Sequence, residues 1–257
     1  MQPGAQQSNQ KSTSILPNGP LAGAWSAVNR LLGWGDAVPG GVWFVGLEQQ
    51  KEWSEEDIRS VNVSAEYLFL PVDKAGRVEG RSGATIRRMT ARIASSVSTE
   101  YQRVDCELRT IEYAKRLWWA GSKLCQANLF PLGKSSFDEW PPNYAEWFGF
   151  TSAADFRNCV RPMRYPILRN AFSDLEPQAV VCFGADCWAE FRDAFDVREG
   201  SLLCVEESPR GSTSIRARFY RRGSSTFVHC PFLARPMTID LARKIGNRLF
   251  ALGVRLP

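Results

Sequence analysis

Four short runs of apolar residues alternate with turn residues and helical patterns along the chain. They lie at residues 42–45, 123–129, 179–183 and 226–229, and their length and composition are those of strands. Runs that are apolar at nearly every position are typical of strands buried on both faces, as in parallel sheets. The pattern therefore predicts a central, mostly parallel, four-stranded sheet.

Helical periodicity appears in the stretches between these runs. Apolar residues recur at three- and four-residue steps in 85–97 and 238–252, and segments 105–120 and 185–195 also favour helices. Helices that cover both faces of a parallel sheet form a three-layer α/β/α sandwich. We therefore predict the α/β fold class.

Residues 201–220 follow a different rhythm. The segments SLLCVEE and SIRARFY are separated by SPRGST, which is rich in turn residues, so we expect a β-hairpin. The alternation in SIRARFY assigns Arg216 and Arg218 to one face and the apolar residues between them to the other.

Composition indicates one globular domain preceded by an arm. Residues 1–20 are rich in Gln, Ser, Asn, Gly and Pro without an apolar period, so we expect a flexible arm there and a single domain over 21–257. The chain has neither an apolar run of about 18 residues nor a signal-peptide pattern, so we expect a cytoplasmic protein with no membrane contact. Nothing in the sequence indicates an obligatory protein partner.

Charge and cysteine content narrow the chemistry. Seven irregularly spaced cysteines without a CxxC pair favour reduced thiols, and a single histidine argues against zinc, so we expect no metal and no cofactor. The net charge is +5. Local clusters of basic residues suit a phosphate backbone, although a solvated basic surface explains them equally well. They are Arg87 and Arg88; Arg161, Arg164 and Arg169; and Arg216, Arg218, Arg221 and Arg222.

Polar residues stand at three of the four predicted strand ends. Glu48 follows Gly46 and Leu47, Asn128 ends the second run, and His229 ends the last. In open α/β sheets, ligands bind beyond the carboxyl ends of the strands. Taken singly, Glu48 also fits a helix N-terminal charge, Asn128 a turn residue and His229 an interior histidine.

The order of five motifs resembles that of the uracil-DNA glycosylase superfamily over about residues 42–252. Along the chain they are GVWFVGLEQQ, GRVEGRSGATIRRM, KLCQAN, LEPQAVVCFGADCW and FVHCPFLARP. Each motif alone is weak, and the order gives the resemblance its weight.

The resemblance implies a DNA glycosylase that flips a base out of DNA and hydrolyses its N-glycosidic bond. Glu48 would orient and deprotonate the attacking water, and His229 would hydrogen-bond the negative charge that develops on the departing base. Asn128 would read the base, since an amide offers both a donor and an acceptor.

The resemblance also implies less specific roles for several other residues. Phe232 and Leu233 also fit core packing, and several tryptophans besides Trp53 could stack on a base. The expected roles are base contact for Gly46, Leu47 and Trp53, an apolar wedge for Phe232 and Leu233, and phosphate contact for Arg81, Ser82 and Arg235.

Two departures from the family pattern bear on the substrate. Cys230 stands between His229 and the proline, and Gln49 and Gln50 replace the Pro-Tyr that follows the acidic residue in the classical uracil enzymes. That tyrosine lies where a 5-substituent would sit, so we expect the substrate to be uracil or, in preference, a 5-modified pyrimidine such as a phage hydroxymethyl- or glucosyl-cytosine. The role would then be defence against phage instead of repair.

Two other functions remain open at this point. The same fold without catalysis would give a sensor that binds modified DNA and leaves its bonds intact. A hydrolase of free nucleosides would use similar acid and amide groups without needing a basic surface.

Overall fold

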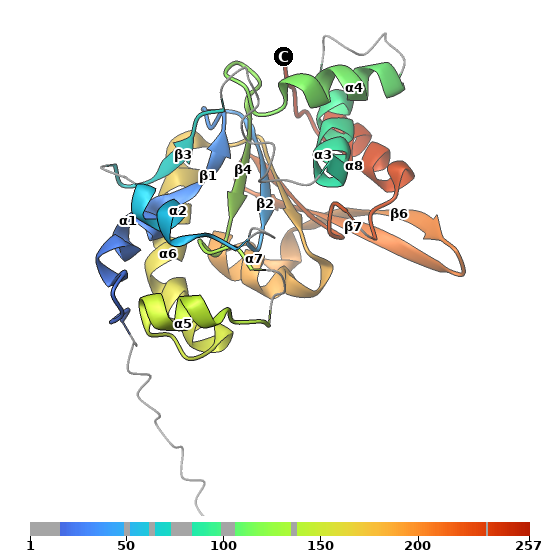
Figure 1. The fold of residues 1–257 in the computed structure, drawn as a ribbon. Helices are drawn as coiled ribbons and strands as arrows, with labels where there is room; N and C mark the ends of the chain where they lie inside the picture. The colour runs from blue at the N-terminus through green and yellow to red at the C-terminus, as the bar shows by residue number, and fades with distance from the viewer. Residues whose placement is uncertain are drawn as a thin grey trace, which may run out of the picture.

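A computed structural model describes residues 16–48, 52–61, 65–72, 84–98, 106–134, 138–234 and 236–257. Its strands form one sheet with helices packed around it, which confirms the α/β class (Figure 1). Within these residues the strands are β1 (Leu31–Gly35), β2 (Val42–Gly46), β3 (Leu68–Leu70), β4 (Leu124–Asn128), β5 (Ala179–Phe183), β6 (Leu202–Arg210), β7 (Thr213–Arg222) and β8 (Ser225–Cys230).

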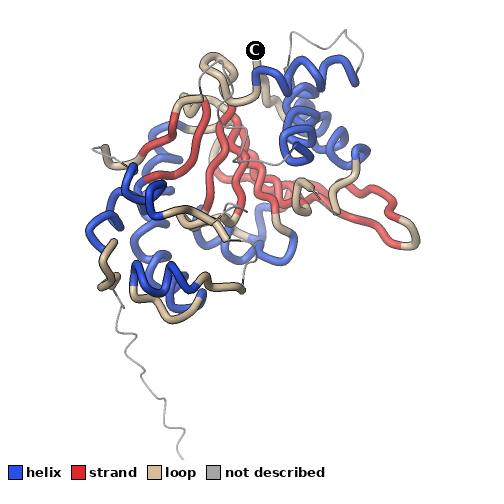
Figure 2. The backbone as a smooth tube through the Cα atoms, in the orientation of Figure 1, coloured by secondary structure: helices blue, strands red, loops and turns tan. Residues whose placement is uncertain are grey.

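The sheet is larger than the four strands predicted from the sequence. Within the described part of the chain it has eight strands in the order β3-β1-β4-β2-β5-β8-β7-β6. The four predicted strands form its parallel centre, β4-β2-β5-β8. The predicted hairpin, β6–β7, continues the sheet antiparallel to β8 and projects beyond the helices (Figure 2).

Strand β1 was missed because its sequence, LLGWG, has two glycines, which weaken a strand pattern. It pairs antiparallel with β4 and parallel with β3. A Cβ atom on Gly33 would lie 1.8 Å from the carbonyl oxygen of Gln126, so the close approach of β4 requires glycine there. Gly33 therefore makes β1 possible and at the same time weakens the apolar pattern by which a strand is recognised in the sequence.

Helices pack on both faces of the sheet and create two apolar cores. The first core joins α1 (Trp25–Arg30), α6 (Ala153–Leu175) and α7 (Trp188–Phe195), and the second joins α3 (Ala84–Val97), α4 (Cys106–Arg116) and α8 (Ile239–Ala251). Alternation along β2 sends Trp43 and Val45 into the first core and Val42 and Phe44 into the second.

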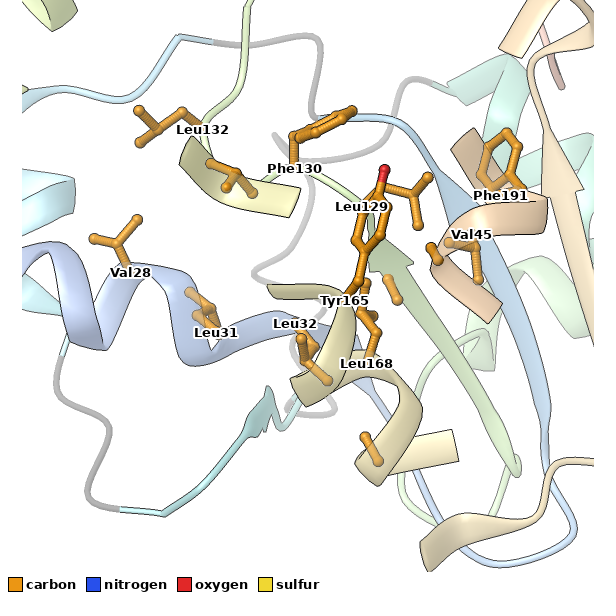
Figure 3. Packing of buried hydrophobic residues seen from close by; sticks show 14 of the residues in the cluster. Val28, Leu31, Leu32, Val45, Leu129, Phe130, Leu132, Tyr165, Leu168 and Phe191 are labelled. Atoms are coloured by element: carbon orange, nitrogen blue, oxygen red, sulfur yellow. The ribbon is translucent and has the colours of Figure 1, made fainter. Parts of the chain in front are cut away.

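The first core shows how distant segments meet. Tyr165 and Leu168 of α6 lie beside Leu32 of β1, and Leu129 lies close to Tyr165 (Figure 3). Helix α6 was not predicted, because Pro162 and Pro166 lie inside it and proline usually ends a helix. The buried face of α6 outweighs this penalty.

The predicted helices are found close to their expected bounds. Segments 85–97, 105–120 and 238–252 contain α3, α4 and α8, and 185–195 contains the 3-10 helix η2 (Ala185–Cys187) and α7. Thr238 caps α8 by accepting a hydrogen bond from the Leu241 amide at 3.1 Å. The other helical elements are η1 (Ala22–Ala24), α2 (Glu55–Ser60), α5 (Pro142–Phe148) and η3 (Glu199–Ser201).

The expected arm, residues 1–20, lies mostly outside the described residues. Its last part is tied to α5, because the amide of Asn18 donates to the Phe148 carbonyl at 3.1 Å. Leu21 donates to the Trp147 carbonyl at 2.9 Å, so contact with the domain begins before residue 21. No helix in the described ranges is long and apolar enough to cross a membrane.

Replacement of Gly246 by alanine tests the contact between α3 and α8. An added Cβ would lie 2.4 Å from Ser96 Cβ and 2.6 Å from the Ile93 carbonyl, so Gly246→Ala should lower the free energy of unfolding by about 1–3 kcal/mol. Gly23→Ala is the control, because its Cβ meets nothing within 4 Å. Urea unfolding measures both, and a Gly246→Ala variant as stable as wild type would contradict this packing.

Candidate functional site

The strand register brings four residues into one row at the carboxyl edge of the sheet. Gly46 pairs with Asn128, and Phe183 pairs with Cys230. A Cβ on Gly46 would lie 2.8 Å from the Phe183 ring and 3.3 Å from Asn128 Oδ1. Gly46 is therefore needed for the ring and the amide to approach each other, and Phe183 joins the predicted pair Gly46 and Asn128.

Asn128 holds a buried amide whose oxygen is not used by the fold. The residue is 3% exposed, and no described group hydrogen-bonds its Oδ1. Leaving a buried acceptor unsatisfied costs about 1–3 kcal/mol. Asn29 Oδ1 and Gln126 Oε1 also lack a partner among the described residues. A ligand donor at Asn128 Oδ1 would remove the cost.

Glu48 lies just beyond β2 in a similarly buried position. Its side chain is 9% exposed, and its Oε1 lies 3.0 Å from the ammonium nitrogen of Lys134, which is fully buried. Its Oε2 has no hydrogen-bond partner within the described residues. Burial raises the pKa of Glu48 from 4.5 to about 7, and the nearby Lys134 opposes this shift without cancelling it. The carboxyl group therefore titrates near neutral pH.

Two backbone hydrogen bonds bring Lys134 to Glu48. The amide of Leu129 donates to the Gly46 carbonyl at 3.0 Å, and that of Phe130 donates to the Leu47 carbonyl at 2.7 Å. The segments after β2 and β4 consequently run side by side. Lys134 was not predicted from the sequence. Only its position six residues after Asn128 could have suggested it.

Helix α5 closes this part of the site. Its Tyr144 hydroxyl donates to the Gly133 carbonyl and accepts from the amide of Trp53, both at 2.7 Å. Trp53, Asn128 and other residues line a cavity of about 10 Å³, enough for about one water. Tyr144 thus ties Trp53 to the loop that carries Lys134.

The histidine is not brought together with the predicted base-reading residue. His229 lies one residue before the strand end, and its ring stacks on Trp188 with centroids 4.8 Å apart, on the α7 side of the sheet. Trp188 in turn stacks on Tyr220 at 4.7 Å. Because side chains alternate along a strand, Cys230 and not His229 shares the face of Asn128. His229 and Asn128 therefore project from opposite faces of the sheet, and the roles expected of them stay predictions.

Cys230 itself is an inert member of the row. Its thiol is buried, with Sγ 3.5 Å from the Cys182 carbonyl oxygen, and burial raises its pKa well above the ordinary value. It therefore stays a neutral thiol at physiological pH.

The wedge prediction fails for Leu233. This residue is 0% exposed and belongs to the second core, so it cannot enter DNA without opening that core. Phe232 is half-buried, with its ring 5.8 Å from that of Phe183. Leu47 is half-buried against the first core. Arg81, Ser82, Arg235, Gln49 and Gln50 lie outside the described residues.

One predicted basic cluster does not form a phosphate-binding surface. Arg161 pairs with Glu190, and Arg169 donates to the carbonyls of Asp193 and Ala194. Arg164 is completely buried. These arginines bind groups of the protein itself, and their closeness in sequence reflects successive turns of α6.

No family model matches this chain, and no curated protein matches it significantly. In the described ranges no three His, Cys, Asp or Glu side chains are grouped to hold a metal ion.

Replacement of Glu48 tests its burial through the pH dependence of stability. The folded state holds the Glu48 proton more tightly than the unfolded state, so this stabilisation is complete below about pH 4.5 and is lost as the pH rises through about 7. Between about pH 5 and 8, wild type should lose about 2–3 kcal/mol relative to Glu48→Gln.

Urea unfolding at several pH values measures this difference. Glu55→Gln is the control, because it removes the same charge from an exposed residue of α2. Parallel pH profiles for wild type and Glu48→Gln would show that Glu48 titrates as an ordinary exposed carboxyl group.

Proposed function

We propose that this protein is a DNA glycosylase that hydrolyses the N-glycosidic bond of a flipped base and leaves an abasic site. One observation carries the proposal. At the ends of adjacent parallel strands lie two buried acceptor oxygens, Glu48 Oε2 and Asn128 Oδ1, which no described group satisfies. A carboxyl group and an amide at the ends of neighbouring strands match the two tasks of this reaction, water activation and base recognition.

Glu48 is suited to the role of general base. Hydrolysis leaves positive charge on the sugar and negative charge on the base, as in glycoside hydrolysis. Lys134 holds Oε1, which leaves Oε2 to accept a proton from the water that attacks the sugar carbon. A pKa near 7 is close to the value at which general-base catalysis is most efficient at neutral pH.

Asn128 and Phe183 are suited to bind the base. The amide supplies a donor and an acceptor to a pyrimidine edge, which is worth about 1–3 kcal/mol of discrimination. The Phe183 ring beside Gly46 supplies an aromatic wall. The net charge of +5 favours DNA as the partner. Because GLEQQ lacks the Pro-Tyr of uracil enzymes, the substrate proposed is a 5-modified pyrimidine, and the role is phage defence or repair.

A second candidate is a sensor that binds modified DNA without cleaving it. The observation that favours it is the position of His229, which lies in the Trp188 stack instead of beside Asn128. Cys230 occupies the row in its place, and a neutral thiol is a weak hydrogen-bond donor. The site would then bind a base without stabilising its departure.

Base release from defined duplexes distinguishes the two functions. The panel contains uracil, 5-substituted cytosines and glucosylated phage DNA, and free base and alkali-labile sites are measured. Glu48→Gln should lower the rate by about 100- to 10,000-fold because it removes the general base. Asn128→Ala should lower discrimination between bases by about 1–3 kcal/mol, whereas Glu55→Gln should act like wild type.

If no base is released, binding measured on the same duplexes shows which proposal holds. Tight, salt-dependent binding without release of any base would establish the sensor. If the protein neither releases a base nor binds any of the duplexes, both proposals are rejected.

The pH dependence of the rate provides an independent test of Glu48. Since only the carboxylate accepts a proton, single-turnover rates should rise about tenfold per pH unit up to about pH 7 and then level off. A rate that is constant between about pH 5 and 8 would exclude Glu48 as the general base.

A further inference from the structure

Arg164 of α6 is a completely buried cation whose hydrogen-bond partners among the described residues are all backbone oxygens. Its Nη2 and Nε donate to the Asn128 carbonyl at 2.8 and 3.3 Å. Its Nη1 donates to the Asn29 carbonyl at 2.5 Å, and its Nη2 also reaches the carbonyls of Leu31 and Leu32 at 3.0 and 3.5 Å. Among the described residues no carboxylate forms a salt bridge with it. Burial lowers the pKa of Arg164 to about 9, so it remains charged at neutral pH.

Two of these carbonyls, those of Asn29 and Asn128, lie at the C-terminal ends of secondary-structure elements. Asn29 is in the last turn of α1, whose final carbonyls have no helical donor. Asn128 is the last residue of β4. Removal of a charge from water is costly, so a buried arginine is maintained only where its fork of donors satisfies several acceptors at once.

We infer that Arg164 is a positioning residue for the base-reading amide of Asn128, an inference that rests on the proposed function. Two hydrogen bonds to one carbonyl fix the peptide plane that follows the Asn128 Cα. The side chain of Asn128 carries Oδ1, which faces Gly46. The guanidinium therefore restrains the backbone from one side of the sheet while the side chain projects toward the site on the other.

The fork of Arg164, and not merely its charge, performs this role. A lysine is a single point donor and cannot bond the carbonyls of Asn128, Asn29 and Leu31 in this geometry. In Arg164→Lys the discrimination between target and unmodified base, measured as a ratio of kcat/KM values, should fall about 10- to 100-fold.

A buried arginine away from the site provides the matched control. Arg92 on α3 is also buried, and it pairs with Glu107 of α4. Arg92→Lys should lower the unfolding midpoint without changing discrimination. If it changed discrimination as much as Arg164→Lys does, general destabilisation would explain the effect.

A double-mutant cycle separates positioning from stability. If Arg164 acts through Asn128, Arg164→Lys should cause no further loss of discrimination in a protein that already carries Asn128→Ala. Additive losses would overturn the inference. Arg164→Gln is the second variant in case Arg164→Lys does not fold, because it removes the buried charge together with the fork. Failure of both to fold would assign Arg164 to folding alone.

A measurement without substrate keeps this inference separate from the proposed function. The side-chain amide signal of Asn128 in a ¹⁵N spectrum is assigned by its loss in Asn128→Asp. It should shift or split in Arg164→Lys and stay unchanged in Arg92→Lys. If wild type releases no base while this signal responds, the glycosylase proposal fails and the positioning role stands. An unchanged signal would overturn the positioning role.

Discussion

The hydrogen-bond register of β4, β2, β5 and β8 determines which side chains can act together. Each strand shares its register with the next, so residues at one level form a row across the sheet. Since side chains alternate between faces, a shift by one residue moves a group to the opposite core. Asn128 and Cys230 share a row and a face for this reason, and His229 lies on the other side.

Two buried cations hold the segment around Asn128. Lys134 binds the Glu48 carboxylate, and Arg164 binds the carbonyl of Asn128. Both are completely shielded from solvent, where an unpaired charge would be very costly. Their partners are therefore held firmly, while Glu48 Oε2 and Asn128 Oδ1 have no hydrogen-bond partner among the described residues. Rigid surroundings for a few reactive groups are what pre-organised sites require.

How far the sequence points to each residue of the candidate site has a common physical explanation. Glu48 and Asn128 follow directly from the rule that ligands bind at the carboxyl ends of parallel strands, which needs only strand boundaries. Lys134 and Tyr144 depend on how irregular loops fold back, for which the sequence has no period. Leu233 and Arg164 carry types of side chain common on DNA-binding surfaces, and only burial shows that the fold uses both internally.

The sequence alone determined the α/β class, the four central strands, the main amphipathic helices and two polar strand ends, because these depend on local periodicity and on short-range turn chemistry. The tertiary structure alone decided that the sheet has further strands, since β1 exists only where Gly33 lets it approach β4. It also decided that α6 runs through two prolines, and that His229 lies apart from Asn128. Each of these outcomes depends on contacts between residues far apart in the chain, and such contacts leave no periodic trace in the sequence.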